Sequence, residues 1–241
     1  MRDKNAVLAS LLESGASSLG IDLPSDAIAA FESYFMLLED RGRSVNLTAI
    51  KGEEDVARLH FLDSIALLRA IQFKDASIID IGSGAGFPGI PLKIAEPSVS
   101  LTLLDSSRKR ISFVSELCAA LGIKADFILS RAEDSARTAS LRENFDIVVS
   151  RSVARLNILC ELCLPFVRLD GAFIAMKGVD SAGELSEALA AIKTLGAEFL
   201  DHFDYTLPGT DITHRAIIIR KSAETPSKYP RRFPRIEKTP L

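Results

Sequence analysis

The sequence has few of the residues that build cross-linked or metal-binding proteins: three cysteines and three histidines among 241 residues. An odd and sparse set of cysteines argues against a disulfide framework and fits a reducing compartment. Cys160 and Cys163 form a lone C-x-x-C pair between leucines, so we interpret them as small core residues. The histidines show no ligand spacing, and the sequence predicts no metal site.

Long apolar runs and a large excess of positive charge are also missing. No run approaches the roughly 18 apolar residues of a membrane span, and the N-terminus lacks the apolar stretch of a secretory signal. We therefore expect a cytoplasmic monomer without membrane contact. The formal net charge is −3, so any contact with nucleic acid must come from local basic patches.

The predicted domain organisation has three parts, which are residues 1–74, 75–222 and 223–241. The first part is predicted to be helical because apolar residues recur at helical spacing from Val7 to Leu19 and from Ile28 to Leu38. Arg41-Gly42-Arg43 is expected to end the second of these helices. A third helix is predicted from Asp55 to Ala70.

Residues 75–222 alternate between short β-rich runs and helical segments. The predicted strands are Ser77–Ile81, Ser100–Asp105, Ala125–Ser130, Asp146–Ser150, Ala172–Lys177, Glu198–Leu207 and His214–Lys221. The predicted helices are Pro91–Glu96, Lys109–Leu121, Ala154–Leu164 and Ala182–Leu195. Alternation of this kind predicts an α/β fold with a mostly parallel sheet covered on both faces. The turn signal at Pro208-Gly209-Thr210-Asp211 makes the last two strands an antiparallel hairpin.

Residues 223–241 are rich in proline, lysine and arginine and are predicted to form an extended basic tail. One hypothesis is that this tail contacts RNA phosphates, which attract local clusters of Lys and Arg. The alternative is a terminal tail that is simply solvated.

The segment Asp80-Ile81-Gly82-Ser83-Gly84-Ala85-Gly86 lies between a predicted strand and a predicted helix. Glycines let a backbone approach a ligand closely, and a helix N-terminus supplies free N–H groups. The turn therefore predicts a nucleotide-like ligand. Gly84, Gly86 and Gly89 also satisfy the G-x-G-x-x-G spacing of dinucleotide-binding proteins. An NAD(P)-dependent oxidoreductase is thus an alternative, and a purely structural turn is another.

Three features favour S-adenosylmethionine as the cofactor, and one of them is shared with NAD enzymes. Asp80 lies just before Gly82, where a carboxylate suits the cationic end of S-adenosylmethionine better than a pyrophosphate. Asp105 ends the next strand, where it can accept hydrogen bonds from both ribose hydroxyls, as in NAD enzymes. An antiparallel hairpin after five parallel strands is typical of class I S-adenosylmethionine-dependent methyltransferases. We therefore predict this Rossmann-like fold with an N-terminal helical extension.

The loops after the later strands carry further candidate site residues, because such loops face the ligand crevice of a parallel sheet. Ala132 and Glu133 are placed to border an adenine, although acids are also common in a first helical turn. Arg151 follows the fourth strand and is placed to face the reacting atoms, unless it is a solvated surface arginine. Lys177, at the end of the fifth strand, is placed to touch the substrate or a phosphate.

No obvious general base accompanies these residues. The fourth strand is followed by Arg151-Ser152-Val153, not by the Asn/Asp-Pro-Pro-aromatic motif of enzymes that methylate exocyclic amines. Guanine N7 carries a lone pair and no proton, so its methylation needs alignment of the reactants and no base. The lack of a base is consistent with this chemistry.

Several segments resemble one known family over nearly the whole chain. They are Asn46-Leu47-Thr48, His60-Phe61-Leu62-Asp63-Ser64, Asp80 to Gly86 with the extension Phe87-Pro88-Gly89-Ile90-Pro91, Leu104-Asp105-Ser106, Ser150 to Ala154, Met176-Lys177-Gly178 and the tail Lys228 to Arg232. The chain resembles the ribosomal RNA small subunit methyltransferase G family, also called glucose-inhibited division protein B. Phe233 departs from the family tail, which more often has a small residue there.

The resemblance implies N7-methylation of guanine 527 in 16S rRNA, so 16S rRNA and the small ribosomal subunit are the expected partners. It also implies cofactor contacts at Gly82, Phe87, Ala132-Glu133, Arg151 and the Asp105 loop. With the turn itself, the expected cofactor-binding residues are Asp80, Gly82, Gly84, Gly86, Phe87, Asp105, Ser106, Ser107, Ala132, Glu133 and Arg151. The catalytic residues stay unknown, and Arg151, Lys177 and Asp63 are the candidates for positioning the substrate.

Overall fold

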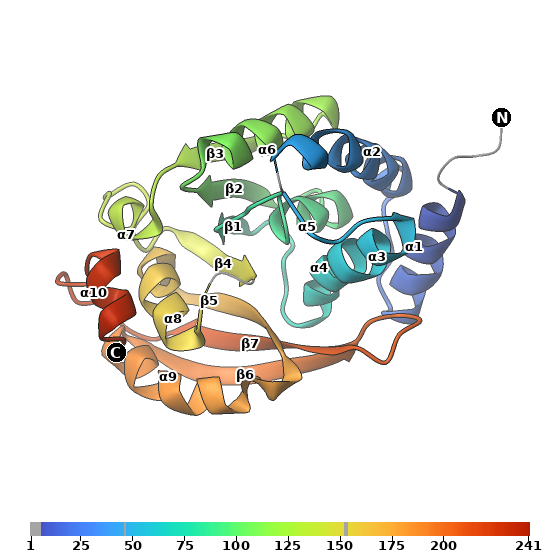
Figure 1. The fold of residues 1–241 in the computed structure, drawn as a ribbon. Coiled ribbons are helices and arrows are strands. Elements are labelled where there is room, and N and C mark those ends of the chain that lie inside the picture. Colours follow the sequence, from blue (N-terminus) through green and yellow to red (C-terminus); the bar gives the residue numbers. More distant parts are fainter. Residues whose placement is uncertain (1–5, 46, 152–153) are drawn as a thin grey trace.

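The computed structural model describes residues 6–45, 47–151 and 154–241, and it is built around one seven-stranded sheet (Figure 1). The strands are β1 Ser77–Ile81, β2 Ser100–Asp105, β3 Ala125–Leu129, β4 Phe145–Arg151, β5 Val167–Gly178, β6 Ala197–Thr206 and β7 Thr213–Lys221. Their order is β3-β2-β1-β4-β5-β7-β6. Strands β1 to β5 pair in parallel, and β7 pairs antiparallel with β5 and β6. The mostly parallel sheet and the terminal antiparallel hairpin are confirmed.

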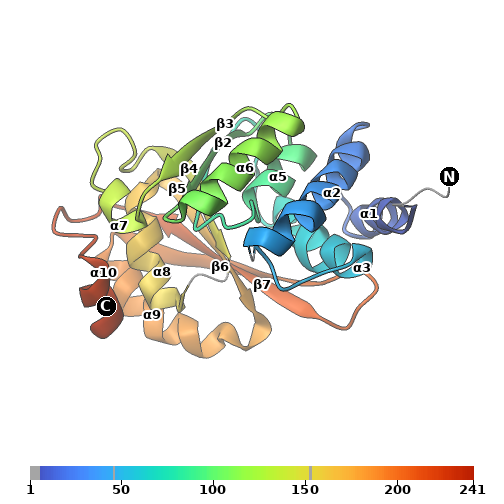
Figure 2. The same ribbon diagram turned by 45° about the horizontal axis from the view of Figure 1, so that its top comes forward.

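Helices cover both faces of the sheet, and Figure 2 shows α2, α5 and α6 together on one side and α8 and α9 on the other. The helices are α1 Ala6–Ser18, α2 Ala27–Val45, α3 Glu53–Val56, α4 Asp63–Ile65, α5 Gly89–Ala95, α6 Arg108–Ala120, α7 Ala132–Ser135, α8 Leu156–Cys163, α9 Ala182–Thr194 and α10 Phe233–Lys238. Short 3-10 turns lie at Ala66–Arg69, Leu164–Phe166 and Val179–Ser181. None of the described helices has the length and apolarity that crossing a membrane requires.

Alternate residues of the central strands belong to two different core clusters. Ile78 and Leu103 pack with the N-terminal helices, whereas Ile79 and Leu104 pack with α8 and α9. This explains why apolar residues follow one another directly in β1 and β2, as at Ile78-Ile79 and Leu103-Leu104, since both faces of these strands are buried. Leu8 and Phe31 lie in the same cluster as Ile78, so the N-terminal helices and the sheet share one core.

Two predictions about the N-terminal helices are wrong. Helix α2 continues through Gly42 and ends at Val45, not at Arg41-Gly42-Arg43. The predicted helix from Asp55 to Ala70 is divided into α3, a π-helical turn at Ala57–Leu62, α4 and a 3-10 turn. The Leu59 and His60 carbonyls of the π turn accept hydrogen bonds from the side chains of Arg151 and Ser64, at 3.0 and 2.6 Å. Side-chain donors thus stabilise a backbone register that an isolated helix rarely adopts.

The prediction of an extended tail is also wrong, because the C-terminal residues fold back and include α10. Tyr229 and Ile236 are buried. Arg231 forms an ion pair with Glu161, a fully buried carboxylate of α8 that needs a charged partner. The proposed RNA contact of the tail stays a prediction, and it now rests on the exposed residues Lys228, Arg232, Arg235 and Lys238.

Candidate functional site

The glycine-rich turn connects β1 to α5 at the carboxyl end of the sheet. Gly82, Gly84 and Gly86 have φ angles of 74°, 57° and 105°, a region that side chains other than glycine rarely adopt. A Cβ on Gly86 would also lie 2.5 Å from Cδ1 of Ile90. The turn therefore requires glycine at these positions, as the sequence pattern suggested.

Asp80, at the end of β1, is fully buried. Its Oδ2 accepts a 2.8 Å hydrogen bond from the Gly89 amide, whereas Oδ1 has no partner among the described residues. Burial raises the pKa of Asp80 to about 7. A Cβ on Gly89 would lie 2.9 Å from Asp80 Oδ2. The third glycine of the dinucleotide-like spacing therefore makes room for a carboxylate, not for a pyrophosphate.

Asp105, at the end of β2, links two loops. Its Oδ2 accepts a hydrogen bond from the Gly84 amide at 3.0 Å, and its Oδ1 accepts one from the Ser107 amide at 2.8 Å. Arg110 lies 3.5 Å from Oδ2. The carboxylate is buried but keeps lone pairs for a ligand, since each oxygen can accept more than one hydrogen bond.

Two cavities open at this end of the sheet. The first, which we call the Asp105 cavity, has a volume of about 490 Å³ and is bounded by the loops after β1 to β4. Its lining residues are Leu47, Ile81, Gly82, Gly84, Leu104, Asp105, Ser106, Arg110, Ser130, Arg131, Ala132, Glu133, Arg151, Leu162 and Phe233. Seven of the expected cofactor-binding residues thus meet around one space, and these are Gly82, Gly84, Asp105, Ser106, Ala132, Glu133 and Arg151.

The second cavity, which we call the His60 cavity, has a volume of about 510 Å³. It is lined by Leu47, Thr48, Ile50, Leu59, His60, Asp63, Gly82, Ser83, Gly84, Ala85, Phe87, Arg151, Met176, Lys177, Gly178 and His214. Phe87 and all three substrate-positioning candidates belong to this set. The remaining expected residues, Asp80, Gly86 and Ser107, line neither cavity. Leu47, Gly82, Gly84 and Arg151 border both cavities, so the two spaces meet there.

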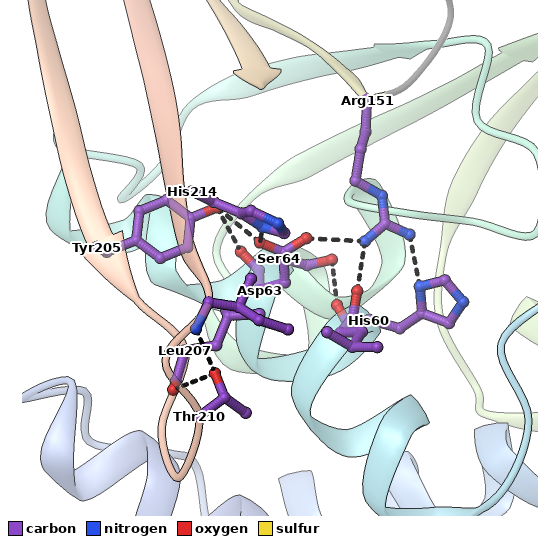
Figure 3. Close-up of polar contacts among 10 residues, drawn as sticks. His60, Asp63, Ser64, Arg151, Tyr205, Leu207, Thr210 and His214 are labelled. Atoms are coloured by element: carbon purple, nitrogen blue, oxygen red, sulfur yellow. Dashed lines mark hydrogen bonds and ion pairs between the residues drawn. The ribbon is translucent and has the colours of Figure 1, made fainter. Parts of the chain in front are cut away.

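Arg151 and Asp63 form a buried ion pair between the end of β4 and the start of α4 (Figure 3). Nη1 of Arg151 lies 3.1 Å from Oδ2 of Asp63 and donates to the Leu59 carbonyl. Oδ1 of Asp63 accepts hydrogen bonds from the Tyr205 hydroxyl and from Nδ1 of His214, both at 2.7 Å. Burial by itself would raise the pKa of Asp63, but the bond from His214 and the charge of Arg151 outweigh it and lower that pKa.

His60 lies on the other side of Arg151 in a fixed orientation. Its Nδ1 is 2.8 Å from Nη2 of Arg151, and its Nε2 is 2.7 Å from Oγ1 of Thr48. Because a guanidinium only donates, Nδ1 must accept and Nε2 must carry the proton. The ring also stacks on Phe87, with a centroid distance of 4.2 Å. Burial and the charge of Arg151 lower the pKa of His60 to about 3, so the ring is neutral at physiological pH.

From the lowered pKa of His60 we predict how the stability of the protein depends on pH. As pH falls below 6.5, the unfolded chain takes up a proton that the folded ring takes up only near pH 3. His60 therefore contributes fully above pH 6.5 and loses that contribution as pH falls. We expect the stability advantage of the wild type over His60→Asn to shrink by about 2 kcal/mol between pH 7.5 and pH 5. Urea unfolding of both proteins at each pH measures it.

The comparison must be with a variant, because burial of Asp80 acts in the opposite sense. The pKa of Asp80 is raised in the folded state. Its buried charge therefore destabilises the folded protein less and less as pH falls below 7. Both proteins contain Asp80, and its contribution cancels in the difference. His202→Asn, which changes an exposed histidine of β6, is the matched control. A wild-type advantage over His60→Asn that stays constant with pH would contradict the prediction.

His214, from β7, is half-buried at the wall of the His60 cavity. The hydrogen bond to Asp63 raises the pKa of His214, which favours the protonated ring. Lys177 also borders this cavity, but its ammonium lies 2.8 Å from a Glu184 oxygen and 2.6 Å from the Ala154 carbonyl. The cavity therefore presents a ring with donor character, while the charge of Lys177 is paired.

The sequence did not identify Thr48, Tyr205, His214 or Phe233 as site residues. Tyr205 and His214 are on the antiparallel strands, and they reach Asp63 only because β7 is inserted beside β5. Ser152 and Val153, which belong to a family-like segment, lie outside the described residues, as does Asn46. Within the described part of the chain, no group of three or more His, Cys, Asp or Glu residues is arranged to hold a metal ion.

A known family and known proteins match this chain over most of its length. Residues 27–205 match the family described as GidB, rRNA small subunit methyltransferase G. The chain is 45% identical to ribosomal RNA small subunit methyltransferase G of Alkaliphilus oremlandii, over 97% of this chain and 99% of the relative. It is 43% identical to the same protein of Pelotomaculum thermopropionicum, over 98% of this chain and 100% of the relative.

Solved structures show the fold at lower identity. M. jannaschii TYW2 in complex with AdoMet aligns with a TM-score of 0.51 and 12% identity, over 66% of this chain and 76% of that chain. The ribosomal protein L11 methylase of Lactobacillus delbrueckii subsp. bulgaricus aligns with a TM-score of 0.51 and 16% identity, over 68% and 80%. Both alignments show a similar fold over about two thirds of this chain.

Proposed function

Because the chain belongs to the rRNA small subunit methyltransferase G family, we propose that it transfers a methyl group from S-adenosylmethionine to N7 of guanine 527 in 16S rRNA. The family relationship decides against the oxidoreductase that the spacing of Gly84, Gly86 and Gly89 had left open. Within this family, the proposal concerns the cofactor contacts, the atom that is methylated and the residues that hold the target base. It also places the enzyme in the cytoplasm, as a monomer acting on the small ribosomal subunit.

The residues around the Asp105 cavity fit S-adenosylmethionine. Asp80 lines neither cavity, but its orphaned Oδ1 is a buried acceptor beside the glycine turn, and a cationic ligand group would satisfy it directly or through water. The turn between Gly82 and Gly86 lets the backbone approach the ligand closely. Asp105 has lone pairs for ribose hydroxyls, and the loop at Ala132 and Glu133 bounds the space for the adenine. When bound, S-adenosylmethionine supplies an electrophilic methyl group.

The target base would enter the His60 cavity, which adjoins the Asp105 cavity at Arg151. A base can reach such a space only when it is exposed or turned out of its stack. Arg151 is held at the junction by Asp63, His60 and the Leu59 carbonyl, so its position is fixed before any ligand binds. In this proposal Asp63 is a positioning residue, because its oxygens are occupied by Arg151, His214 and Tyr205.

The state of the titratable groups in the His60 cavity carries the assignment to N7. His60 has its Nδ1 lone pair occupied by Arg151 and a pKa of about 3, so it is a poor base. Asp63 has a lowered pKa and accepts three hydrogen bonds. His214 favours its protonated form, which donates. These groups suit an acceptor such as guanine N7, whose lone pair is free without removal of a proton.

The same arrangement supports guanine over adenine. The edge of guanine that carries N7 also carries the O6 acceptor, whereas adenine has an amino donor at the equivalent position. A protonated His214 can donate a hydrogen bond to O6, but it has no free ring lone pair with which to accept one from an amino group. We therefore propose that His214 reads O6 of the target guanine.

Methyl transfer followed by nucleoside analysis tests the proposal. The enzyme is incubated with labelled S-adenosylmethionine and small ribosomal subunits, or with 16S rRNA alone, and the labelled nucleoside and its position are determined. We expect 7-methylguanosine at position 527. A product methylated at N1 or N2, positions that carry a proton, would overturn the proposal and would make the Asp63–His214 pair a general base.

A further inference from the structure

The C-terminal segment reaches the Asp105 cavity. Phe233, the first residue of α10, lines this cavity together with the segment after β3, which comprises the loop residues Ser130 and Arg131 and the α7 residues Ala132 and Glu133. The guanidinium carbon of Arg131 lies 5.2 Å from the centre of the Phe233 ring. Figure 1 shows α10 near α7 and α8, on the face of the sheet opposite the N-terminal helices.

Buried contacts fix the position of this segment. Arg231 donates to both oxygens of Glu161 through Nε and Nη2, at 2.8 and 2.6 Å, and its amide donates at 2.7 Å. Glu161 is fully buried. Arg142 donates to the carbonyls of Thr225 and Tyr229, at 2.6 and 3.0 Å. Phe233 is therefore anchored on both sides in the sequence: Arg231 precedes it, and Ile236, which is completely buried, follows it.

The chemistry of the surrounding loops indicates which part of a ligand meets Phe233. Asp105 lies after β2, where its lone pairs suit a ribose, and the loop after β3 lies farther along the sheet from the glycine turn. A flat aromatic group beyond the ribose would meet Ala132, Leu162 and the Phe233 ring. Aromatic rings stack on a purine with little dependence on its hydrogen-bonding pattern.

We propose that the C-terminal segment completes the adenine end of the cofactor site, with Phe233 as its aromatic wall and Arg131 fixing the orientation of the ring. This inference rests on the proposed use of S-adenosylmethionine. It assigns a binding role to Phe233, the residue that departs from the family tail. It also explains why buried charges anchor the segment, since a stacking surface acts only if its position is fixed.

Calorimetric titration with two probes tests the inference. S-adenosylhomocysteine contains the whole nucleoside and the amino-acid end, whereas adenosine contains the nucleoside alone. We expect Phe233→Ala to raise the dissociation constant for both probes by about 3- to 10-fold, the range of one aromatic contact. Phe233→Tyr, which keeps the ring, is expected to bind both probes as the wild type does.

Two control variants separate this effect from general damage. Phe199→Ala removes a part-buried aromatic residue of β6, far from the cavity, and is expected to leave both dissociation constants unchanged. Asp80→Asn is expected to weaken S-adenosylhomocysteine much more than adenosine, because Asp80 is assigned to the cationic end. Urea unfolding of each variant verifies that the protein under titration is folded.

The possible outcomes distinguish the inference from the function on which it rests. A folded Phe233→Ala variant that binds both probes as tightly as the wild type, or more tightly, would overturn the role of the segment and leave the proposed function intact. A wild-type protein that does not bind S-adenosylhomocysteine would overturn the proposed cofactor and this inference with it. Weakened binding of both probes by Phe233→Ala alone supports the inference.

Discussion

Replacing Arg151 with methionine is expected to lower the free energy of unfolding by about 3–5 kcal/mol, the cost of removing one partner from a buried ion pair. Asp63 would keep its hydrogen bonds from His214 and Tyr205 but would lose the permanent positive charge of Arg151 inside the protein. The Leu59 carbonyl and His60 Nδ1 would lose their donor. Urea unfolding of the wild type and the variant at pH 7.5 measures this loss.

Two further variants show whether the effect belongs to this site. Arg155 follows Arg151 closely in the sequence and forms an exposed ion pair with Glu187. We expect Arg155→Met to lower the free energy of unfolding by at most about 1 kcal/mol. Arg151→Lys keeps the charge but cannot reach Asp63, His60 and the Leu59 carbonyl at once, so we expect an intermediate loss. If Arg151→Met were as mild as Arg155→Met, the network would not hold the site together.

Replacing Arg151 should also lower the rate of methyl transfer. Both cavities meet at this residue, and a misplacement of about 1 Å in a positioned site can cost about 100-fold in rate. We expect a loss of this size in Arg151→Lys, measured under conditions in which the variant is folded. A Lys variant with the wild-type rate would show that the guanidinium geometry is not needed for the reaction.

The second large effect is expected from Asp80→Asn. Removing the buried carboxylate should raise the dissociation constant of S-adenosylhomocysteine by about 10- to 100-fold, the value of a hydrogen bond to a charged group. Asparagine keeps the size of the side chain, so the glycine turn and the bond to the Gly89 amide can persist. Calorimetric titration at pH 7.5 measures the change.

The pH dependence makes this prediction more specific. Burial raises the pKa of Asp80 to about 7, and a cationic ligand binds the ionised form. Below pH 7 the ionised fraction falls nearly tenfold per pH unit, so the wild-type affinity should fall from pH 7.5 to pH 5.5. Asp80→Asn should lack this dependence.

Asp146→Asn is the matched control for Asp80→Asn. Asp146 lies at the opposite end of the sheet, where it bonds to Ser77 and Arg168. Its replacement can affect stability, but it should leave the affinity for S-adenosylhomocysteine and its pH profile as in the wild type. Equal affinities in all three proteins would show that the orphaned oxygen of Asp80 does not face the ligand.

Sequence patterns predict those elements of the fold that are determined by residues close together in the sequence. Strands β1 and β2 have the predicted bounds, because each is an apolar run that ends at a carboxylate or just beyond it. The glycine turn was also recognisable, since positive φ angles demand glycine. The nature of its ligand was harder to predict, because the third glycine of the spacing serves Asp80 through a contact that only the folded chain forms.

The missed features all depend on partners that are distant in the sequence. The π turn at Ala57–Leu62 is stabilised by Arg151, which lies on another element. His214 acquires its role from Asp63, and a lone histidine in a strand carries no such signal. The folded tail depends on Glu161, a buried charge in the middle of an apolar helix that could have been noticed as requiring a partner.

The shared wall between the two cavities has a thermodynamic consequence. Arg151, Gly82 and Gly84 border both spaces, so a ligand in one space contacts groups that also meet a ligand in the other. Any factor by which the cofactor changes the affinity for RNA must equal the factor by which RNA changes the affinity for the cofactor. Under the proposed function the same reciprocity holds after transfer: whatever factor this wall imposes on the affinity for the methylated RNA, it imposes equally on the affinity for S-adenosylhomocysteine.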